Sequence, residues 1–290
     1  MPPDPDAVFE AQRPRLLRLA YRMLGSHAEA EDMVQEAWLR WRAVDPATVR
    51  EPPAFLARAV TRLCLDAMKS ARAKREIYVG SWLPEPLIEP EEVAGPDDLT
   101  LTLMLALERL SPLERAAFLL HDVFEVPLEE VAATLGRAPP AVRQLAVRAR
   151  QHVKEARPRF PVAREEGDRM ALVFFQAATS GDLGALRGLL AETVVVESDG
   201  GGKVIAFLNP VVGLDRVLRL FAGLSRKLTA RRTELIRLEW IDGLPGYISR
   251  GGDGVLQTTA LAIEDGRIEA IYITRNPEKL VRVARSLGQA

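Results

Sequence analysis

The sequence contains one cysteine in 290 residues, Cys64, so the chain cannot form an internal disulfide. It also lacks any apolar run that approaches the roughly 20 residues of a membrane-spanning helix. The first ten residues, MPPDPDAVFE, are acidic and rich in proline, unlike a secretory signal. These absences exclude a disulfide-stabilised secreted domain and an integral membrane protein. We expect a cytoplasmic protein that makes no contact with a membrane.

Histidine is scarce as well. The three histidines stand at positions 27, 121 and 152, which leaves none in the C-terminal part of the chain. Carboxylates such as Glu197 and Asp199 remain there, so acid–base catalysis is chemically open, but no cofactor motif accompanies them. We therefore expect a protein that is not an enzyme and that holds no metal ion or cofactor.

What the sequence does have is segregated charge. The formal net charge is only −1. However, Lys and Arg dominate residues 58–75 and residues 137–157, and the stretch PEPLIEPEEVAGPDD between them is acidic. Two basic blocks joined by an acidic connector are typical of a protein that binds a charged partner.

The first 75 residues show helical periodicity. The sequence SHAE at 26–29 predicts a capping box, and apolar residues follow it at helical spacing. EPP at 51–53 starts a further helix with proline in its first turn. Residues 80–97 are rich in proline and predict an extended linker. We place a first helical domain at 1–79 and the linker at 80–97.

A second helical domain is predicted at 98–157, and it contains a helix-turn-helix. SPLE at 111–114 is another capping box. Gly136 ends one short helix in a left-handed conformation, and Pro139 or Pro140 begins the next.

The second helix of this pair carries candidate DNA-binding residues. The first turns of a recognition helix enter the major groove, and Arg143 and Gln144 stand there. Arg148 and Arg150 follow at positions that can meet phosphates. The alternative is an ordinary helical hairpin with a solvated basic face.

From about residue 165 the pattern changes to helices followed by strands. The β-rich run TVVVES is followed by a helix and then by four β segments separated by DG or GDG turns. A curved meander covered by helices is an α+β domain, which we place at 165–285.

The helical part resembles a bacterial RNA polymerase sigma factor of the extracytoplasmic-function class, in the sigma-70 family. AEDMVQEAWLRWR (30–42) resembles the region 2 helix that binds the polymerase. PAFLARAVTRLCLDAMKSARAKRE resembles the part of region 2 that opens and reads the −10 element, and residues 110–151 resemble region 4, which reads the −35 element. The resemblance implies polymerase binding by Asp32, Gln35 and Glu36, and DNA binding by Arg58, Arg62, Lys69, Arg72, Arg143, Gln144, Arg148 and Arg150.

The C-terminal part resembles the SigJ-like group, in which a SnoaL-like (NTF2-like) domain follows region 4. Three motifs carry this resemblance: SWLPEP in the linker, DGGGK at 199–203 and NPEKL at 276–280. The three glycines form either a simple hairpin turn or a close approach of backbone to another surface, with Lys203 available for an acidic partner such as Glu85. The resemblance implies an interdomain regulatory contact through Trp82, Leu83, Pro84, Glu85, Pro86, Asp199, Gly200, Gly201, Gly202, Lys203, Asn276, Pro277, Lys279 and Leu280.

The sequence therefore predicts a multidomain protein with two all-α sigma domains, the second with a helix-turn-helix, and a C-terminal α+β cone of the NTF2-like type. The resemblance implies a sigma factor that binds core RNA polymerase, recognises −35 and −10 promoter DNA and is modulated in cis by its C-terminal domain. A small-molecule ligand in that domain stays open. Two other hypotheses remain: a helix-turn-helix regulator independent of polymerase, and a SnoaL-type enzyme with a helical scaffold.

Overall fold

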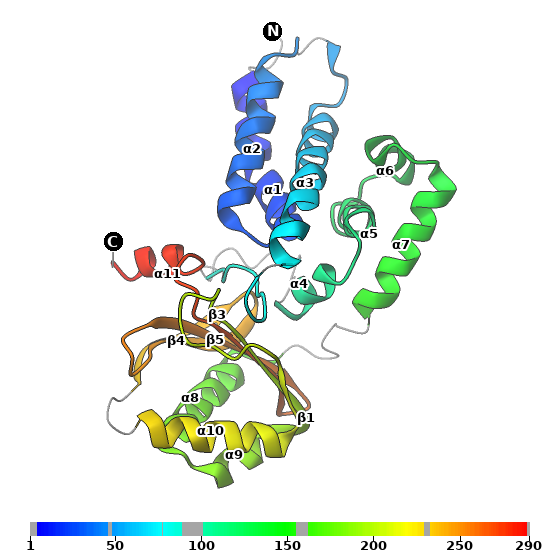
Figure 1. Cartoon of the computed structure of the whole chain (residues 1–290). Coiled ribbons are helices and arrows are strands. Elements are labelled where there is room, and N and C mark those ends of the chain that lie inside the picture. The colour runs from blue at the N-terminus through cyan, green and yellow to red at the C-terminus, as the bar shows by residue number, and fades with distance from the viewer. Residues whose placement is uncertain are drawn as a thin grey trace. The chain divides into compact units, whose positions relative to one another are not determined.

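The computed structural model describes residues 5–45, 48–76, 78–88, 101–154, 162–228 and 233–288. The chain divides into two compact units (Figure 1). The helical unit comprises residues 1–76 and 103–156, and the sheet unit comprises residues 77–102 and 157–290. Residues 77–100, which contain the predicted linker at 80–97 and which we call the linker from here on, therefore belong to the sheet unit.

The first half of the helical unit consists of α1 (Pro5–Leu24), α2 (His27–Arg42) and α3 (Pro52–Glu76). The Ser26 hydroxyl accepts a 3.3 Å hydrogen bond from the backbone N–H of Glu29, which starts α2 where the SHAE pattern predicts it. Cys64 on α3 is fully buried, and burial raises the pKa of its thiol. This lone cysteine is therefore a packing residue and not a reactive one.

The second half contains α4 (Leu101–Glu108), α5 (Pro112–Phe118), the π-helical turn η3 (Leu119–Val123), α6 (Leu128–Leu135) and α7 (Pro139–Lys154). Ser111 and Glu114 form the predicted capping box. Gly136 ends α6 with a φ of 62°, a conformation that favours glycine. The helix α7 packs through buried residues at helical spacing: Val142, Ala146, Ala149 and Val153. The predicted helix-turn-helix is confirmed.

Contacts from one buried and one exposed arginine join the two halves of the helical unit. The fully buried Arg115 guanidinium donates to the carbonyls of Leu107 at 2.8 Å and Met23 at 2.7 Å, and it pairs with Glu108 at 2.6 Å. Arg15 on α1 donates to the Phe124 carbonyl at 2.7 Å. The Arg115 guanidinium satisfies carbonyls that would otherwise lose their hydrogen bonds on burial. These contacts hold the two halves together in this arrangement.

The sheet unit contains six strands in the order β2-β1-β6-β5-β4-β3. The strands β1 and β6 pair in parallel, and the other pairs are antiparallel. Asp242 and Asp265, each followed by glycine, have φ near 50° at the two tight hairpins, as the DG pattern predicts. The elements are α8 (Arg164–Ser180), α9 (Leu183–Leu189), β1 (Leu190–Asp199), β2 (Val211–Val212), α10 (Leu214–Leu228), β3 (Glu234–Ile241), β4 (Leu244–Arg250), β5 (Leu256–Glu264), β6 (Arg267–Thr274) and α11 (Val281–Ser286).

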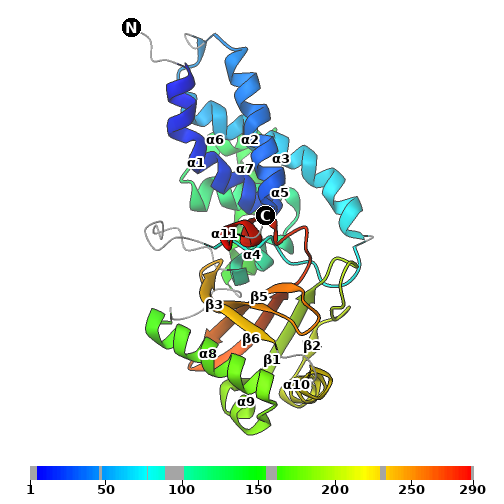
Figure 2. The same ribbon diagram turned by 90° about the vertical axis from the view of Figure 1, so that its left-hand side faces the viewer.

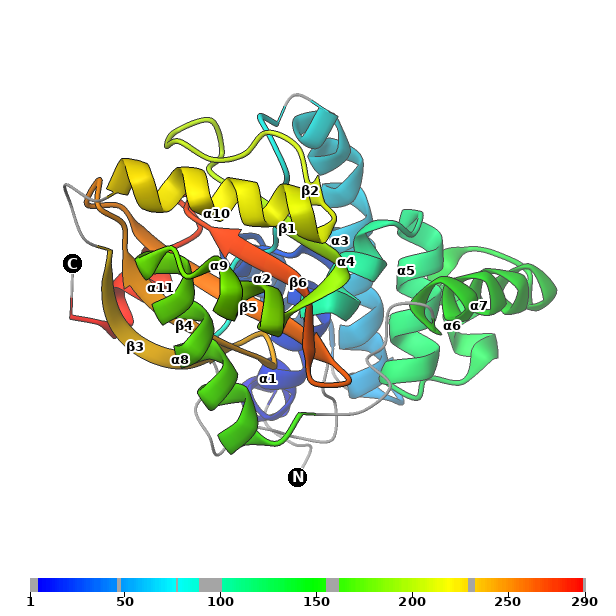
Figure 3. The same ribbon diagram turned by 90° about the horizontal axis from the view of Figure 1, so that it is seen from below.

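The two faces of this sheet are covered differently. The helices α8, α9 and α10 cover one face (Figures 2 and 3), and large side chains such as Phe174, Phe221 and Tyr247 fill the space beneath them. The other face packs Ile248 against α11, with Ile88 of the linker beside it. The predicted α+β architecture is confirmed. None of the helices in the described ranges has the length and apolarity to cross a membrane.

Arg115→Ala tests the buried contact inside the helical unit. Truncation leaves Glu108 and two carbonyls without their donor, so we expect the free energy of unfolding to fall by about 3–5 kcal/mol. Urea denaturation followed by circular dichroism measures the change. The control, Arg40→Ala, removes an exposed pair with Glu36 and should cost about 0.5 kcal/mol or less. Equal costs in the two variants would contradict the assignment.

Candidate functional site

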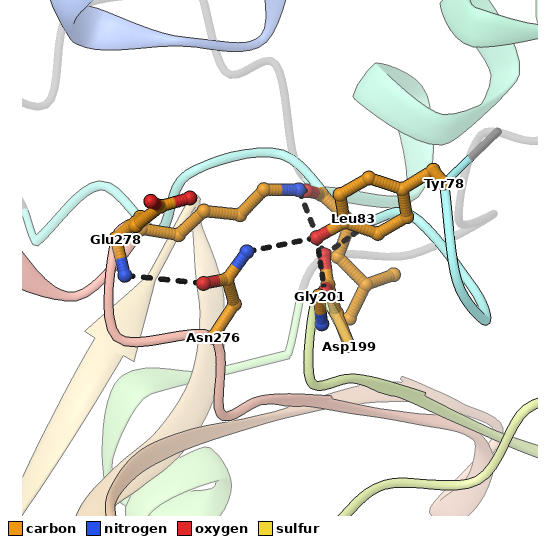
Figure 4. Close-up of polar contacts among 7 residues, drawn as sticks. Tyr78, Leu83, Asp199, Gly201, Asn276 and Glu278 are labelled. Carbon is orange, nitrogen blue, oxygen red and sulfur yellow. Dashed lines mark hydrogen bonds and ion pairs between the residues drawn. The ribbon is translucent and has the colours of Figure 1, made fainter. Parts of the chain in front are cut away.

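The last residue of β1, Asp199, is a fully buried carboxylate that binds the linker (Figure 4). It accepts hydrogen bonds from the Tyr78 hydroxyl at 2.6 Å, the Leu83 backbone N–H at 2.9 Å and the Gly201 N–H at 3.0 Å. The fourth donor is the ammonium of Lys279, 2.7 Å away. The charge of Asp199 is thus compensated, as a buried carboxylate requires.

Lys279 binds the other backbone polar group of Leu83, its carbonyl. Its Nζ donates to the Leu83 carbonyl as well as to Asp199. It also lies 4.1 Å from the centroid of the Trp82 ring and 5.0 Å from that of Tyr78, so two aromatic rings stabilise the cation. Both backbone polar groups of one residue, Leu83, are therefore bound by the Asp199–Lys279 ion pair.

Tyr78 completes this arrangement, and the sequence pattern did not single it out. Its hydroxyl donates to Asp199 and accepts a 2.9 Å hydrogen bond from the Asn276 side chain. Burial, followed by the hydrogen bond to Asp199, raises the pKa of Tyr78. The phenol therefore stays neutral and remains a donor at neutral pH. We call Tyr78, Leu83, Asp199, Gly201, Asn276 and Lys279 the Asp199 cluster.

The glycines of DGGGK bring backbone close to the linker, which was the second of the two predicted alternatives. Gly201 and Gly202 have φ values of 59° and 70°, and a Cβ atom on Gly201 would collide with the Asn276 amide. A Cβ on Gly200 would lie 2.6 Å from the Val204 carbonyl oxygen. Larger residues at these positions are excluded by strain and by contact.

Lys203 pairs with an acidic residue, as predicted, but the partner is Glu278 and not the suggested Glu85. This ion pair is exposed, and Lys279 occupies the buried position beside the linker. The remaining motif residues lie around the cluster: Pro84, Pro86 and Leu280 are buried, Glu85 is half-buried and Pro277 is exposed.

A second carboxylate binds the linker a few residues further on. The Asp242 side chain accepts a 3.2 Å hydrogen bond from the Leu87 N–H, and the Asp242 N–H donates to the Leu87 carbonyl at 2.9 Å. Ile88 then pairs with Ile241 as an isolated β-bridge. The sequence predicted Asp242 only as a turn residue, because nothing in the WIDG pattern indicates a partner.

In the helical unit, the predicted recognition helix presents an open face. Arg143 and Gln144 are exposed, and within the described ranges no side-chain hydrogen bond or ion pair occupies either of them. Arg148 is exposed on the same helix, whereas Arg150 pairs with Asp122 at 2.6 Å. The guanidinium of Arg150 therefore already has an ion-pair partner within the protein.

The α3 residues predicted to contact the −10 element have more partners within the protein than Arg143 and Gln144 have. Arg62 donates to the Ala133 and Thr134 carbonyls at 3.3 Å, near the end of α6. Lys69 pairs with Asp66 at 2.7 Å on the surface, and Arg58 is half-buried. The side chain of Arg72 lies outside the described residues.

On α2, the predicted polymerase-binding residues share one exposed face. Asp32 and Gln35 are exposed, and Glu36 pairs with Arg40 at 3.0 Å. Leu39 lies on this face too, one turn after Gln35, and is 51% exposed. Leu39 lies outside the apolar stripe that the helical periodicity of α2 defines, so the sequence did not single it out.

Nowhere in the described ranges do three His, Cys, Asp or Glu side chains gather as a metal site would require. The buried carboxylate of the Asp199 cluster already has a lysine ammonium as its cation.

Comparisons with known proteins agree across the chain. Residues 8–74 match the family Sigma-70 region 2, and residues 100–153 match Sigma-70, region 4. The chain is 37% identical over 291 residues to the ECF RNA polymerase sigma factor SigJ of Mycobacterium tuberculosis, covering 93% of this chain and 91% of that protein. It is 33% identical to the probable ECF sigma factor SigI of the same species, covering 97% of each. The crystal structure of SigJ matches with a TM-score of 0.74 at 34% identity, over 94% of this chain and 96% of that one.

Lys279→Met tests the Asp199 cluster. The variant leaves a buried carboxylate without its cation, which typically costs about 3–5 kcal/mol. We therefore expect the Leu83 amide to exchange its hydrogen about a hundredfold faster or more, as measured by hydrogen-exchange mass spectrometry.

The matched control is Lys203→Met, which removes the same charge from an exposed pair and should change this exchange by less than about fivefold. Adding Asp199→Asn to Lys279→Met should restore part of the protection, because no uncompensated charge is then buried. Equal protection in the two lysine variants would show that the cluster does not hold the linker.

Proposed function

Since the chain belongs to the extracytoplasmic-function RNA polymerase sigma factors, we propose that it directs promoter-specific initiation under control of its own C-terminal domain. The observation that carries this proposal is the double contact on Leu83: Asp199 binds its N–H and Lys279 binds its carbonyl. The linker between the two DNA-reading regions is thereby a ligand of the C-terminal domain. Tethering raises the effective concentration of such a contact into the millimolar range.

Contacts with core polymerase and promoter are distributed over three helices. The exposed face of α2, with Asp32, Gln35 and Glu36, binds core polymerase, and Leu39 adds an apolar contact there. The α3 residues Arg58, Arg62, Lys69 and Arg72 meet the −10 element. On α7, Arg143 and Gln144 read −35 base edges, and Arg148 and Arg150 meet phosphates.

The geometry of the helical unit favours an inhibitory role for the linker contact. The −35 and −10 elements are centred about 25 base pairs apart, or about 85 Å of B-form DNA. The two DNA-reading regions contact each other directly through Arg62, so together they cannot cover that span. Promoter binding therefore requires the two regions to separate.

Separation needs a free linker. Residues 77–100 would span about 80 Å when fully extended. While residues 78–88 stay bound to the sheet unit, their share of this length, about 35 Å, cannot extend. Binding of the linker thus opposes the open arrangement, and its release favours promoter engagement.

Catalysis by the C-terminal domain is disfavoured at its most prominent carboxylate. A carboxylate offers about four acceptor positions, and four donors already bind Asp199. It therefore has no acceptor position left for a substrate proton. The role that we assign to Asp199 is binding of the linker, and the protein is not an enzyme.

Transcription from the cognate promoter, reconstituted with core polymerase, tests the regulation. Lys279→Met should raise output more than about fivefold, because it shifts the population toward the released linker. Lys203→Met should leave output unchanged. Equal output from wild type and both variants would overturn control by the linker, and failure of the protein to join core polymerase would overturn the sigma-factor role itself.

Arg143→Ala and Lys154→Ala test the recognition helix. Loss of Arg143 should weaken binding at particular base pairs by about 1–3 kcal/mol. Lys154 is exposed at the end of α7, so its loss should weaken binding evenly across sequences and lower the salt dependence by about one ion. Full promoter specificity and an unchanged salt response in both variants would rule out this helix as the −35 reader.

A further inference from the structure

A groove of about 550 Å³ lies in the sheet unit, outside the helix-covered face of the sheet. Its walls come from α11, from the start of β5 and from the loop after β1. They are largely apolar: Val204, Val255, Leu256, Pro277, Leu280, Val281 and Ala284. The volume is within the range of small-molecule binding sites.

Two guanidinium groups complete the lining, and their charges are not balanced. Arg275 donates to the Ile205 carbonyl and pairs with Asp253 at 2.6 Å. Burial alone would raise the pKa of Asp253, but hydrogen bonds from Arg275 and from the Val255 N–H outweigh it and hold this pKa below its usual range. Asp253 is therefore ionised and compensates one arginine.

The second arginine, Arg285, is exposed at the groove and has no ion-pair partner among the residues that the structure describes. The groove thus combines an apolar wall with one surplus positive charge. An anionic group in the groove would pair with this charge.

From this combination we infer that the groove binds a small amphiphile with an apolar body and a single carboxylate. The apolar body packs on Leu256, Val281 and Ala284, and the carboxylate accepts from Arg285. A neutral apolar molecule would leave the charge without a partner, and a cation would be repelled by it. This site is distinct from the interior of the cone, which Phe174, Phe221 and Tyr247 fill.

The groove adjoins the Asp199 cluster along the backbone. The N–H groups of Arg275 and Asn276 both donate to the Asp199 carbonyl, at 2.7 and 2.9 Å. Pro277 and Leu280, which line the groove, flank Lys279 in the same turn. A ligand in the groove therefore contacts the turn that positions Lys279. Because Lys279 binds the linker, the ligand regulates how firmly the linker is held. This last step rests on the proposed function, whereas binding itself does not.

Isothermal titration of the full chain with octanoate tests the site. We expect saturable one-to-one binding with a dissociation constant below about 1 mM. At matched concentrations, 1-octanol should bind more weakly and octylammonium should not bind. Arg285→Ala should weaken octanoate binding about two- to fivefold, as loss of an exposed ion pair does. The same-helix control, Arg282→Ala, should leave the affinity unchanged.

Val281→Asp provides a second variant at a position that is 44% exposed, where a polar residue is compatible with folding. Its carboxylate repels the anion, so octanoate affinity should fall more than about tenfold. Absence of octanoate binding up to 1 mM, or equal affinity in wild type and both groove variants, would overturn the site. Binding without any effect on linker exchange would preserve the site and reject only its link to regulation.

Discussion

One buried ion pair organises the sheet unit around a segment from elsewhere in the chain. Asp199 is fully buried, and the side chain of Lys279 is only 10% exposed. Two opposite charges removed from water are stable only when every remaining donor and acceptor is satisfied. The linker provides these groups: the Tyr78 hydroxyl and the Leu83 N–H donate to Asp199, and the Leu83 carbonyl accepts from Lys279. The buried ion pair is therefore stable only while the linker is bound, and the linker is held in place by the ion pair.

This dependence explains why three short motifs far apart in the sequence occur together. The glycines after Asp199 let the backbone turn without side chains that would displace Asn276. Asn276 orients the Tyr78 hydroxyl, and Lys279 follows in the same turn. Under the proposed function, the segment bound in this way is the one that extends when both promoter elements are read. Stability of the C-terminal domain and availability of the linker are thus coupled.

Much of this architecture could be predicted from local patterns. The capping box at Ser111 and Glu114, Gly136 in the turn and the DG hairpins follow from backbone chemistry that a few residues determine. The motif residues around Asp199 were predicted from resemblance, but their pairing was not, because contacts such as Lys279 with Leu83 depend on tertiary structure. Tyr78 and Leu39 carried no motif signal, and Asp242 was predicted only as a turn residue. The acidic partner of Lys203 is Glu278 and not the suggested Glu85, because such pairings also depend on tertiary structure.

The distance between the two DNA-reading regions in free protein tests the central claim most directly. Because Cys64 is buried, spin labels can be attached selectively through Arg40→Cys on α2 and Arg137→Cys at the turn before α7. Pulsed electron paramagnetic resonance should give one short, narrow distance distribution in this background. Adding Lys279→Met should lengthen and broaden it, because the linker is then released. An identical distribution with and without Lys279→Met would show that binding of the linker does not control separation of the regions.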